Sequence, residues 1–302
     1  MKVTKVIPSG YCKGVVHAIN LVKKTRTQYP NENIYILGMI VHNTYITEAL
    51  KSLDIITLND HLKTKEEWID EIDDGIIIFT AHGISDSIIE KVKRKGLKYV
   101  DASCTDVIKT KNIVKEKLLE GYEILYIGKK SHPEAEAILD ISDKIHLITD
   151  INSIKELGTY PKVFVTNQTT MSIYEIDYLF KEIASKYPDA IFQEEICNAT
   201  SSRQKATLEL KDCDTLYIVG DIRSNNSNKL KEIAISNGIK TVRLIGSALE
   251  IYENDLKDAE NVYVTAGAST PTYLTNQVID VLNDYDKTHI LKKPSIDFNK
   301  II

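Results

Sequence analysis

Three cysteines divide the chain almost evenly, and each lies in the same kind of local sequence. Cys12, Cys104 and Cys197 are separated by 92 and 93 residues, and their contexts read VIPSGYCKGV, KYVDASCTDV and IFQEEICNAT. Each follows an apolar run typical of a strand and precedes a helical pattern. One thiol at the same strand-to-helix corner of each repeat predicts three similar units whose thiols meet near a pseudo-threefold axis. The alternative is three unrelated buried cysteines.

Short apolar, β-branched runs alternate with longer amphipathic segments along the whole chain. This alternation is typical of an α/β protein with parallel sheets that helices cover on both faces. The expected strands are 3–7, 33–38, 75–80, 98–102, 123–128, 145–149, 162–166, 190–194, 215–220, 240–246 and 261–267. The expected helices include 106–121, 172–187, 226–238 and 272–285.

The alternation repeats with the cysteines and so predicts the domain organisation. We expect three pseudo-symmetric α/β units, residues 1–103, 104–196 and 197–286, followed by a tail, residues 287–302, without helical periodicity. Because no Gly/Ser-rich or Pro-rich linker separates them, the units should pack as one body.

Composition and charge narrow the classes of function. The 302 residues are 43% hydrophobic and 27% charged, as in an ordinary globular protein, and the net charge of −5 argues against binding to nucleic acid or to an anionic membrane. The first twenty residues lack the apolar core of a signal peptide, and no run approaches the roughly 20 apolar residues of a membrane span. We therefore expect a cytoplasmic protein whose cysteines are reduced or metal-bound.

Three thiolates on one centre favour an iron–sulfur cluster or zinc. A centre without a fourth protein ligand keeps one position open for a substrate. Cys213 falls outside the regular spacing, just before an expected strand, and is expected to be a half-buried thiol without a ligand role.

Polar turns follow the expected strands, where open α/β sheets bind their ligands. These turns are VHN (41–43), AHG (81–83), SHPEAE (131–136), NQTT (167–170), SNNSN (224–228) and GAST (267–270). Histidines, hydroxyls, amides and helix N-termini together suit an anion, phosphate above all. The turns at 224–228 and 269–271 equally suit helix N-caps, and a cap and a phosphate site can share the same free amides.

Two acids in the 131–136 turn admit two interpretations. Glu134 and Glu136 follow Pro133, which suits the first position of a helix, and acids in a first turn interact favourably with the helix dipole. A carboxyl two residues after His132, at a strand end, can instead serve as a proton donor. The residues alone leave both roles open. The histidines without a functional assignment are His17, His61, His146 and His289.

Neither the phosphate-binding loop of ATPases nor a dinucleotide-binding glycine motif occurs in the chain, and an H-E-x-x-H zinc motif is also absent. Electrons for a redox reaction should therefore come from another protein.

The motifs as a set resemble a known family. SGYCKGV, VHN, AHG, DASC, SHPEAE, NQTT, EEICNATSSRQ, SNNSN and TAGAST follow one another between residues 6 and 285 as in the 4-hydroxy-3-methylbut-2-enyl diphosphate reductases (IspH, or LytB). The resemblance implies three α/β units around a central [4Fe–4S] cluster. It also implies two-electron, two-proton removal of the substrate's allylic hydroxyl, which gives isopentenyl and dimethylallyl diphosphates, with a ferredoxin- or flavodoxin-like electron donor.

The resemblance also assigns residues. It implies that Cys12, Cys104 and Cys197 ligate the cluster and that one iron stays open to the substrate. Glu134 matches the residue that delivers a proton to the leaving hydroxyl, Thr169 a hydroxyl in the same network, and His132 a neighbour of the substrate. The diphosphate-binding positions are matched by His42, His82, Ser224, Asn225, Asn226 and Ser269.

The chain departs from the family pattern near these positions. Lys13 replaces a small residue, Thr105 replaces proline, Ser224-Asn225 replaces two serines, and Asp221-Ile222-Arg223 is unusual ahead of that turn. The alternative to the reductase is a divergent paralogue that uses the same open iron as a lyase or hydratase, or on another substrate. A non-catalytic iron–sulfur sensor is less favoured, because a sensor needs the thiols but not the acid.

Overall fold

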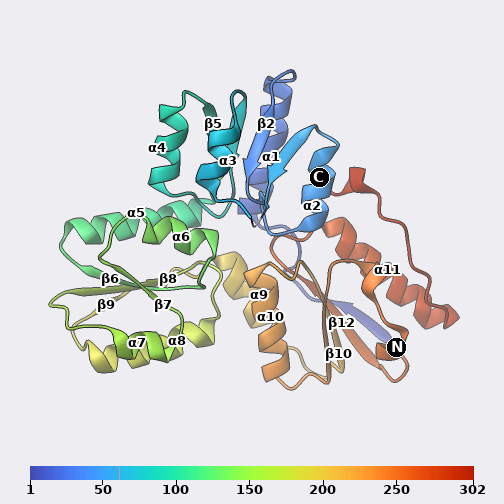
Figure 1. The fold of residues 1–302 in the computed structure, drawn as a ribbon. Coiled ribbons are helices and arrows are strands. Elements are labelled where there is room, and N and C mark those ends of the chain that lie inside the picture. Colours follow the sequence, from blue (N-terminus) through green and yellow to red (C-terminus); the bar gives the residue numbers. More distant parts are fainter. Residues whose placement is uncertain (61) are drawn as a thin grey trace. The chain divides into compact units, whose positions relative to one another are not determined.

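The computed structural model describes residues 1–60 and 62–302 and folds them into parallel sheets flanked by helices (Figure 1). His61, which received no functional assignment, lies outside the described residues. The first sheet has the order β3 (Ile55–Leu58), β2 (Ile34–Leu37), β4 (Ile76–Phe79), β5 (Lys98–Asp101). The second has the order β7 (Ile145–Ile148), β6 (Glu123–Ile127), β8 (Val163–Asn167), β9 (Ile191–Phe192). The third has the order β11 (Thr241–Ile245), β10 (Thr215–Val219), β12 (Asn261–Ala266), β1 (Lys2–Lys5).

Helices alternate with these strands. They are α1 (Lys13–Gln28), α2 (Thr44–Lys51), α3 (Lys65–Glu71), α4 (Asp86–Arg94), α5 (Thr105–Leu119), α6 (Pro133–Leu139), α7 (Ile151–Glu156), α8 (Ile173–Lys186), α9 (Asn198–Leu208), α10 (Asn225–Ser236) and α11 (Thr272–Thr288). Short 3₁₀ turns are η1 (Ala248–Glu250), η2 (Glu253–Asp255) and η3 (Phe298–Lys300). The α/β fold with three parallel sheets, predicted from the alternation, is confirmed.

The three sheets share one strand order, and this order explains the spacing of the cysteines. Reading each sheet from one edge gives its second, first, third and fourth strand, and the fourth strand leads to a cysteine in every case. In the third sheet the fourth place belongs to β1, from the start of the chain, which pairs in parallel with β12. The expected strand 3–7 therefore does not join the sheet of residues 34–101.

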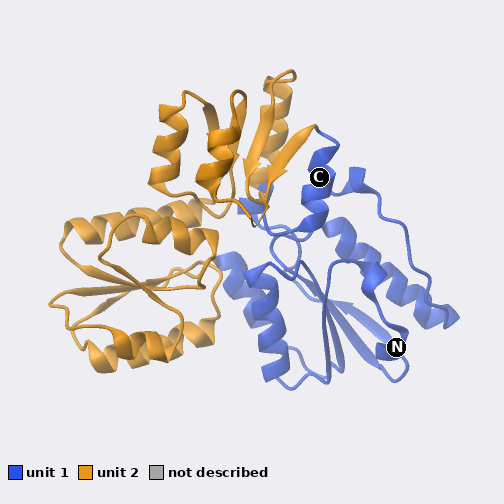
Figure 2. Cartoon of the chain, in the orientation of Figure 1, with its two compact units in different colours: residues 1–16, 41–53, 198–302 blue, residues 17–40, 54–197 orange. Residues whose placement is uncertain are grey.

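The chain divides into two compact units (Figure 2). Unit 1 comprises residues 1–16, 41–53 and 198–302 and holds the third sheet; unit 2 comprises residues 17–40 and 54–197 and holds the other two. The division into segments 1–103, 104–196, 197–286 and 287–302 stays a prediction. The end of the chain packs within unit 1, where the Tyr11 hydroxyl donates to the Ile301 carbonyl at 2.8 Å and Ile301 is buried.

Burial along the strands follows their place in the sheet. Every residue of the inner strands β4, β8 and β10 is buried, which accounts for their continuous apolar runs. The edge strands β3 and β5 are partly exposed. We did not predict β3.

In unit 1 the start of α10 packs closely against the carboxyl ends of β10 and β12. A Cβ atom added at Gly220 would lie 2.4 Å from the Ser227 Oγ, and one added at Gly267 would lie 2.2 Å from it. Ser227 itself is fully buried. The N-terminus of α10 can therefore pack this closely only because glycine follows both β10 and β12.

We predict that Gly220→Ala lowers the free energy of unfolding by about 1–3 kcal/mol, the usual cost of overpacking. The matched control is Gly158→Ala, where the added methyl group would meet nothing closer than 3.6 Å. Thermal unfolding of both variants measures the difference. Equal stability in the two variants would contradict the close packing of α10.

Candidate functional site

The three regularly spaced cysteines have the same local geometry. Each backbone amide donates to a carbonyl in the polar turn that follows the third strand of a sheet, and each cysteine directly precedes a helix, α1, α5 or α9. The three bonds are Cys12 to Ala268 at 3.0 Å, Cys104 to Ala81 at 3.0 Å and Cys197 to Thr169 at 3.1 Å. The predicted equivalence of the three sequence contexts is thus present in the backbone.

These thiols suit a sulfur-ligated centre. All three thiols are partly exposed and none is in a disulfide. Each cysteine directly precedes a helix, and the positive end of the helix dipole favours the negatively charged thiolate that a cluster requires. Cys12 belongs to unit 1, whereas Cys104 and Cys197 belong to unit 2. Among residues 1–60 and 62–302, neither unit by itself contains three His, Cys, Asp or Glu side chains grouped so that they could bind a metal ion. The meeting of the three thiols therefore stays a prediction.

Cys213 has a different environment. It packs beside the buried residues Leu216, Ile218 and Leu230, and its Sγ lies 3.5 Å from the Thr215 carbonyl oxygen. Burial raises the pKa of this thiol from 9.0 to about 12. A protonated thiol in an apolar cluster is a poor metal ligand, as expected for a structural cysteine.

In unit 2 the polar turns after β6 and β8 meet around a buried carboxyl group. Glu134, in the first turn of α6, is 2% exposed. The Thr169 amide donates to Glu134 Oε1 and the Thr169 hydroxyl to Oε2, both at 2.9 Å. The Tyr126 hydroxyl donates to Oε1 at 3.4 Å. Because the Thr169 carbonyl accepts the Cys197 amide, one threonine connects the acid to a candidate cluster ligand.

Burial raises the pKa of Glu134 from 4.5 to about 7, although the hydrogen bonds from Thr169 and Tyr126 oppose the rise. A carboxyl group with this pKa holds a proton at neutral pH in a large fraction of molecules, as a general acid requires. Glu136, by contrast, is exposed and forms a salt bridge with Lys65 at 3.1 Å. The structure thus separates two acids that the sequence could not distinguish.

Two histidines lie beside this acid. His132 caps α6, and its Nδ1 accepts the Glu134 amide at 3.2 Å. The His82 ring contacts the His132 ring edge-on, with 5.6 Å between centroids, and Thr80 Oγ1 lies 3.4 Å from His82 Nδ1. The structure therefore brings Glu134, Thr169, His132 and His82 together in unit 2.

In unit 1 the remaining predicted residues gather at the edge of the third sheet. Ser224 caps α10 by accepting the Ser227 amide at 3.3 Å, and the Ser269 hydroxyl donates to the His42 carbonyl at 3.1 Å. Asn226 accepts the Ala268 amide at 3.2 Å. Asn225 begins α10 and is buried. The turn at 224–228 is therefore a helix cap, and the anion site proposed from the sequence would use the same residues.

Three supporting residues were not predicted. The Thr200 hydroxyl accepts the Asn226 amide group at 3.1 Å, and an Arg203 guanidinium nitrogen donates to the Gly10 carbonyl, two residues before Cys12, at 2.6 Å. Asn43 caps α2 by accepting the amides of the next turn. Thr200 and Arg203 lie within the ATSSRQ motif. Their partners Asn226 and Gly10 are distant in the sequence, so no local pattern indicates these bonds.

A model of the LytB protein family matches residues 3–283. Curated relatives include proteins of Geobacillus sp. (strain WCH70), 44% identical over 292 residues, and Bacillus mycoides (strain KBAB4), 43% identical over 290 residues. Each alignment covers 95% of this chain and 91% of the relative, and both relatives are named 4-hydroxy-3-methylbut-2-enyl diphosphate reductase.

The chain belongs to the LytB family.

Solved structures agree with this assignment. The E-1-hydroxy-2-methyl-but-2-enyl-4-diphosphate reductase of Plasmodium falciparum superposes with a TM-score of 0.86 at 29% identity, covering 92% of this chain and 86% of that one. A second structure, titled as the terminal enzyme of the non-mevalonate pathway, gives a TM-score of 0.65 at 26% identity, covering 94% and 100%. LytB proteins use an iron–sulfur cluster, which fits a donor set of one thiol per repeat. In the described part of the chain, no helix has the length and apolarity of a membrane span.

The raised pKa of Glu134 predicts a pH-dependent stability. Between about pH 4.5 and about 7 the folded protein binds this proton and the unfolded chain does not, so stability falls as pH rises through this window, by about 3 kcal/mol in total. Glu134→Gln should abolish this fall in stability with rising pH. Glu136→Gln changes an exposed acid and should leave the pH dependence unchanged. Melting temperatures of the anaerobically purified proteins between pH 4.5 and 8 test the prediction. Parallel curves for the wild type and Glu134→Gln would contradict it.

Proposed function

We propose that this LytB protein reductively removes the allylic hydroxyl of 4-hydroxy-3-methylbut-2-enyl diphosphate, giving isopentenyl and dimethylallyl diphosphates. The observation that carries the proposal is the buried Glu134 carboxyl, held by Thr169 next to the Cys197 corner. A hydroxyl leaves as water only if its oxygen gains a proton, and a buried acid with a pKa of about 7 is suited to that task. The names of the relatives support the same substrate.

Cys12, Cys104 and Cys197 are the proposed ligands of a [4Fe–4S] cluster. The equivalent hydrogen bonds of their amides, and the absence of a similar environment around Cys213, support this choice. When bound, such a cluster supplies electrons at low potential and a Lewis-acidic iron. A ferredoxin- or flavodoxin-like protein is the proposed electron donor, because the sequence shows no nucleotide-binding motif of its own.

The diphosphate is proposed to bind through polar turns that follow the strands. Ser224, Asn225 and Asn226 open α10, whose first amides and positive dipole end favour an anion. Ser269, His42 and His82 are the other proposed contacts. Because His132 Nδ1 accepts the Glu134 amide, His132 would donate a hydrogen bond to the substrate through Nε2.

Glu134 is the proposed proton donor to the leaving hydroxyl. Thr169 keeps the carboxyl in one orientation through both of its donors, and His132 fixes the start of α6 through the Glu134 amide. Burial of this network keeps bulk water away from the acid, which strengthens each interaction within it.

We predict that Glu134→Gln retains iron content and substrate binding but loses 10²–10⁴-fold in turnover, the usual contribution of a positioned acid. The Gln amide keeps the size of the side chain, and its oxygen can still accept the Thr169 amide while its NH2 group donates to the Thr169 hydroxyl, but it has no acidic proton. Glu136→Gln is the control and should keep near-normal turnover, because this acid is exposed and paired with Lys65. Anaerobic assays with saturating low-potential reductant measure both. Near-normal turnover in Glu134→Gln would overturn its proposed role.

We predict that Cys12→Ser, Cys104→Ser and Cys197→Ser each lose most of the protein-bound iron and its visible absorption after anaerobic reconstitution. Cys213→Ser should retain both, since its thiol lies in an apolar cluster. Iron and sulfide content and absorption spectra are measured for all four variants. Loss of iron from the Cys213 variant, with retention in any of the other three, would show that the ligand assignment is wrong.

A further inference from the structure

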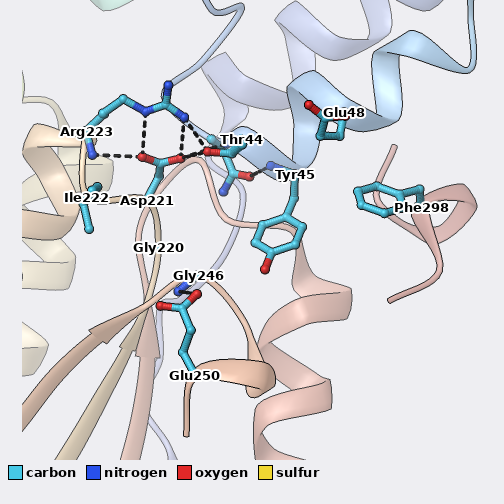
Figure 3. A pocket seen from close by; sticks show the side chains of 11 residues that line it. Thr44, Tyr45, Glu48, Gly220, Asp221, Ile222, Arg223, Gly246, Glu250 and Phe298 are labelled. Carbon is cyan, nitrogen blue, oxygen red and sulfur yellow. Dashed lines mark hydrogen bonds and ion pairs between the residues drawn. The ribbon is translucent and has the colours of Figure 1, made fainter. Parts of the chain in front are cut away.

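Asp221 connects two separate turns of unit 1 that carry proposed diphosphate ligands (Figure 3). Asp221 is 9% exposed. Oδ2 accepts the Thr44 amide at 2.8 Å and the Thr44 hydroxyl at 2.5 Å. Oδ1 accepts the Arg223 amide at 2.9 Å and Arg223 Nε at 3.1 Å. The Arg223 guanidinium also donates to Oδ2 and to the Thr44 hydroxyl, so that the three side chains form a closed network.

The position of this network makes it relevant to the binding site. Thr44 is the first residue of α2 and comes two residues after His42. The Asp221 carbonyl accepts the amide of Ser224, the N-cap of α10, at 2.9 Å. Since the Ser269 hydroxyl donates to the His42 carbonyl, both Asp221 and Ser269 hold the segment 42–44 in place.

The charges in the network balance internally. Burial by itself would raise the pKa of Asp221, but hydrogen bonds from Arg223 and Thr44 outweigh it and hold the pKa well below the usual range. The carboxylate therefore stays ionised at the N-terminus of α2, where the helix dipole favours it. Because Arg223 neutralises this charge, the carboxylate does not repel an anion bound nearby.

We infer that Asp221 is a positioning residue that fixes the His42 turn against the Ser224–Asn226 turn for diphosphate binding, and that Arg223 serves Asp221 rather than the diphosphate. The inference rests on the proposed function for the identity of the ligand. It gives a role to Asp221 and Arg223, which directly precede the Ser224–Asn226 turn.

The test uses inorganic diphosphate as the probe, titrated calorimetrically into the anaerobically purified full-length protein. We expect Asp221→Asn to weaken diphosphate binding about tenfold and to raise KM for the proposed substrate by a similar factor, with kcat within about twofold of the wild type. Loss of one charge-assisted network of this kind is a change of that order. Glu250→Gln is the control: this carboxylate lines the same hollow of about 580 Å³ and accepts the Gly246 amide at 3.0 Å, but holds neither turn.

Thr44→Val serves if Asp221→Asn fails to fold, because it keeps side-chain shape and removes only the hydroxyl; we expect about threefold weaker binding. Unchanged diphosphate affinity in a folded Asp221→Asn or Thr44→Val protein, or an equal loss in Glu250→Gln, would overturn the inference alone. Failure of the wild type to bind diphosphate would instead overturn the proposed function and the inference with it.

Discussion

A backbone hydrogen bond repeated three times sets the geometry on which the candidate site depends. Each of the three proposed ligand cysteines donates its amide to the turn after the third strand of a sheet, directly before a helix begins. The bond fixes each thiol beside a polar turn, because parallel strands end along one edge of their sheet. At Cys197 the same bond leads through Thr169 to the buried acid Glu134. The proposed cluster ligand Cys197 and the proposed proton donor Glu134 are therefore connected through Thr169 within unit 2.

The pKa values of two buried carboxyl groups in this protein shift in opposite directions, and their neighbours explain why. Glu134 has only neutral hydroxyl and amide donors around it, so that burial raises its pKa to about 7. Asp221 is paired with a guanidinium at a helix N-terminus, and its pKa falls. The first is suited to giving up a proton and the second to holding structure. Environment, rather than residue type, separates the two roles.

The sequence predicted the α/β class, the repeat of the three cysteine corners and the identity of most polar turns, because strand periodicity and spacing are local features. It did not predict that β1 completes the sheet of residues 215–266, since strand pairing across the chain leaves no local pattern. The sequence also did not predict the burial of Glu134, whose partners are Tyr126 in β6 and Thr169 in the turn after β8. The sequence marked Asp221 and Arg223 only as unusual residues ahead of a polar turn. It did not predict their partner Thr44, which lies 177 residues from Asp221 and 179 from Arg223.

The central claim is that this protein is a reductase rather than a lyase or hydratase acting through the same open iron. The most direct test counts electrons, by measuring the oxidation of a low-potential dye against the diphosphate products formed under anaerobic conditions. The proposal predicts two electrons consumed for each molecule of isopentenyl or dimethylallyl diphosphate, and no product without reductant. Conversion of the substrate without any consumption of reductant would contradict it.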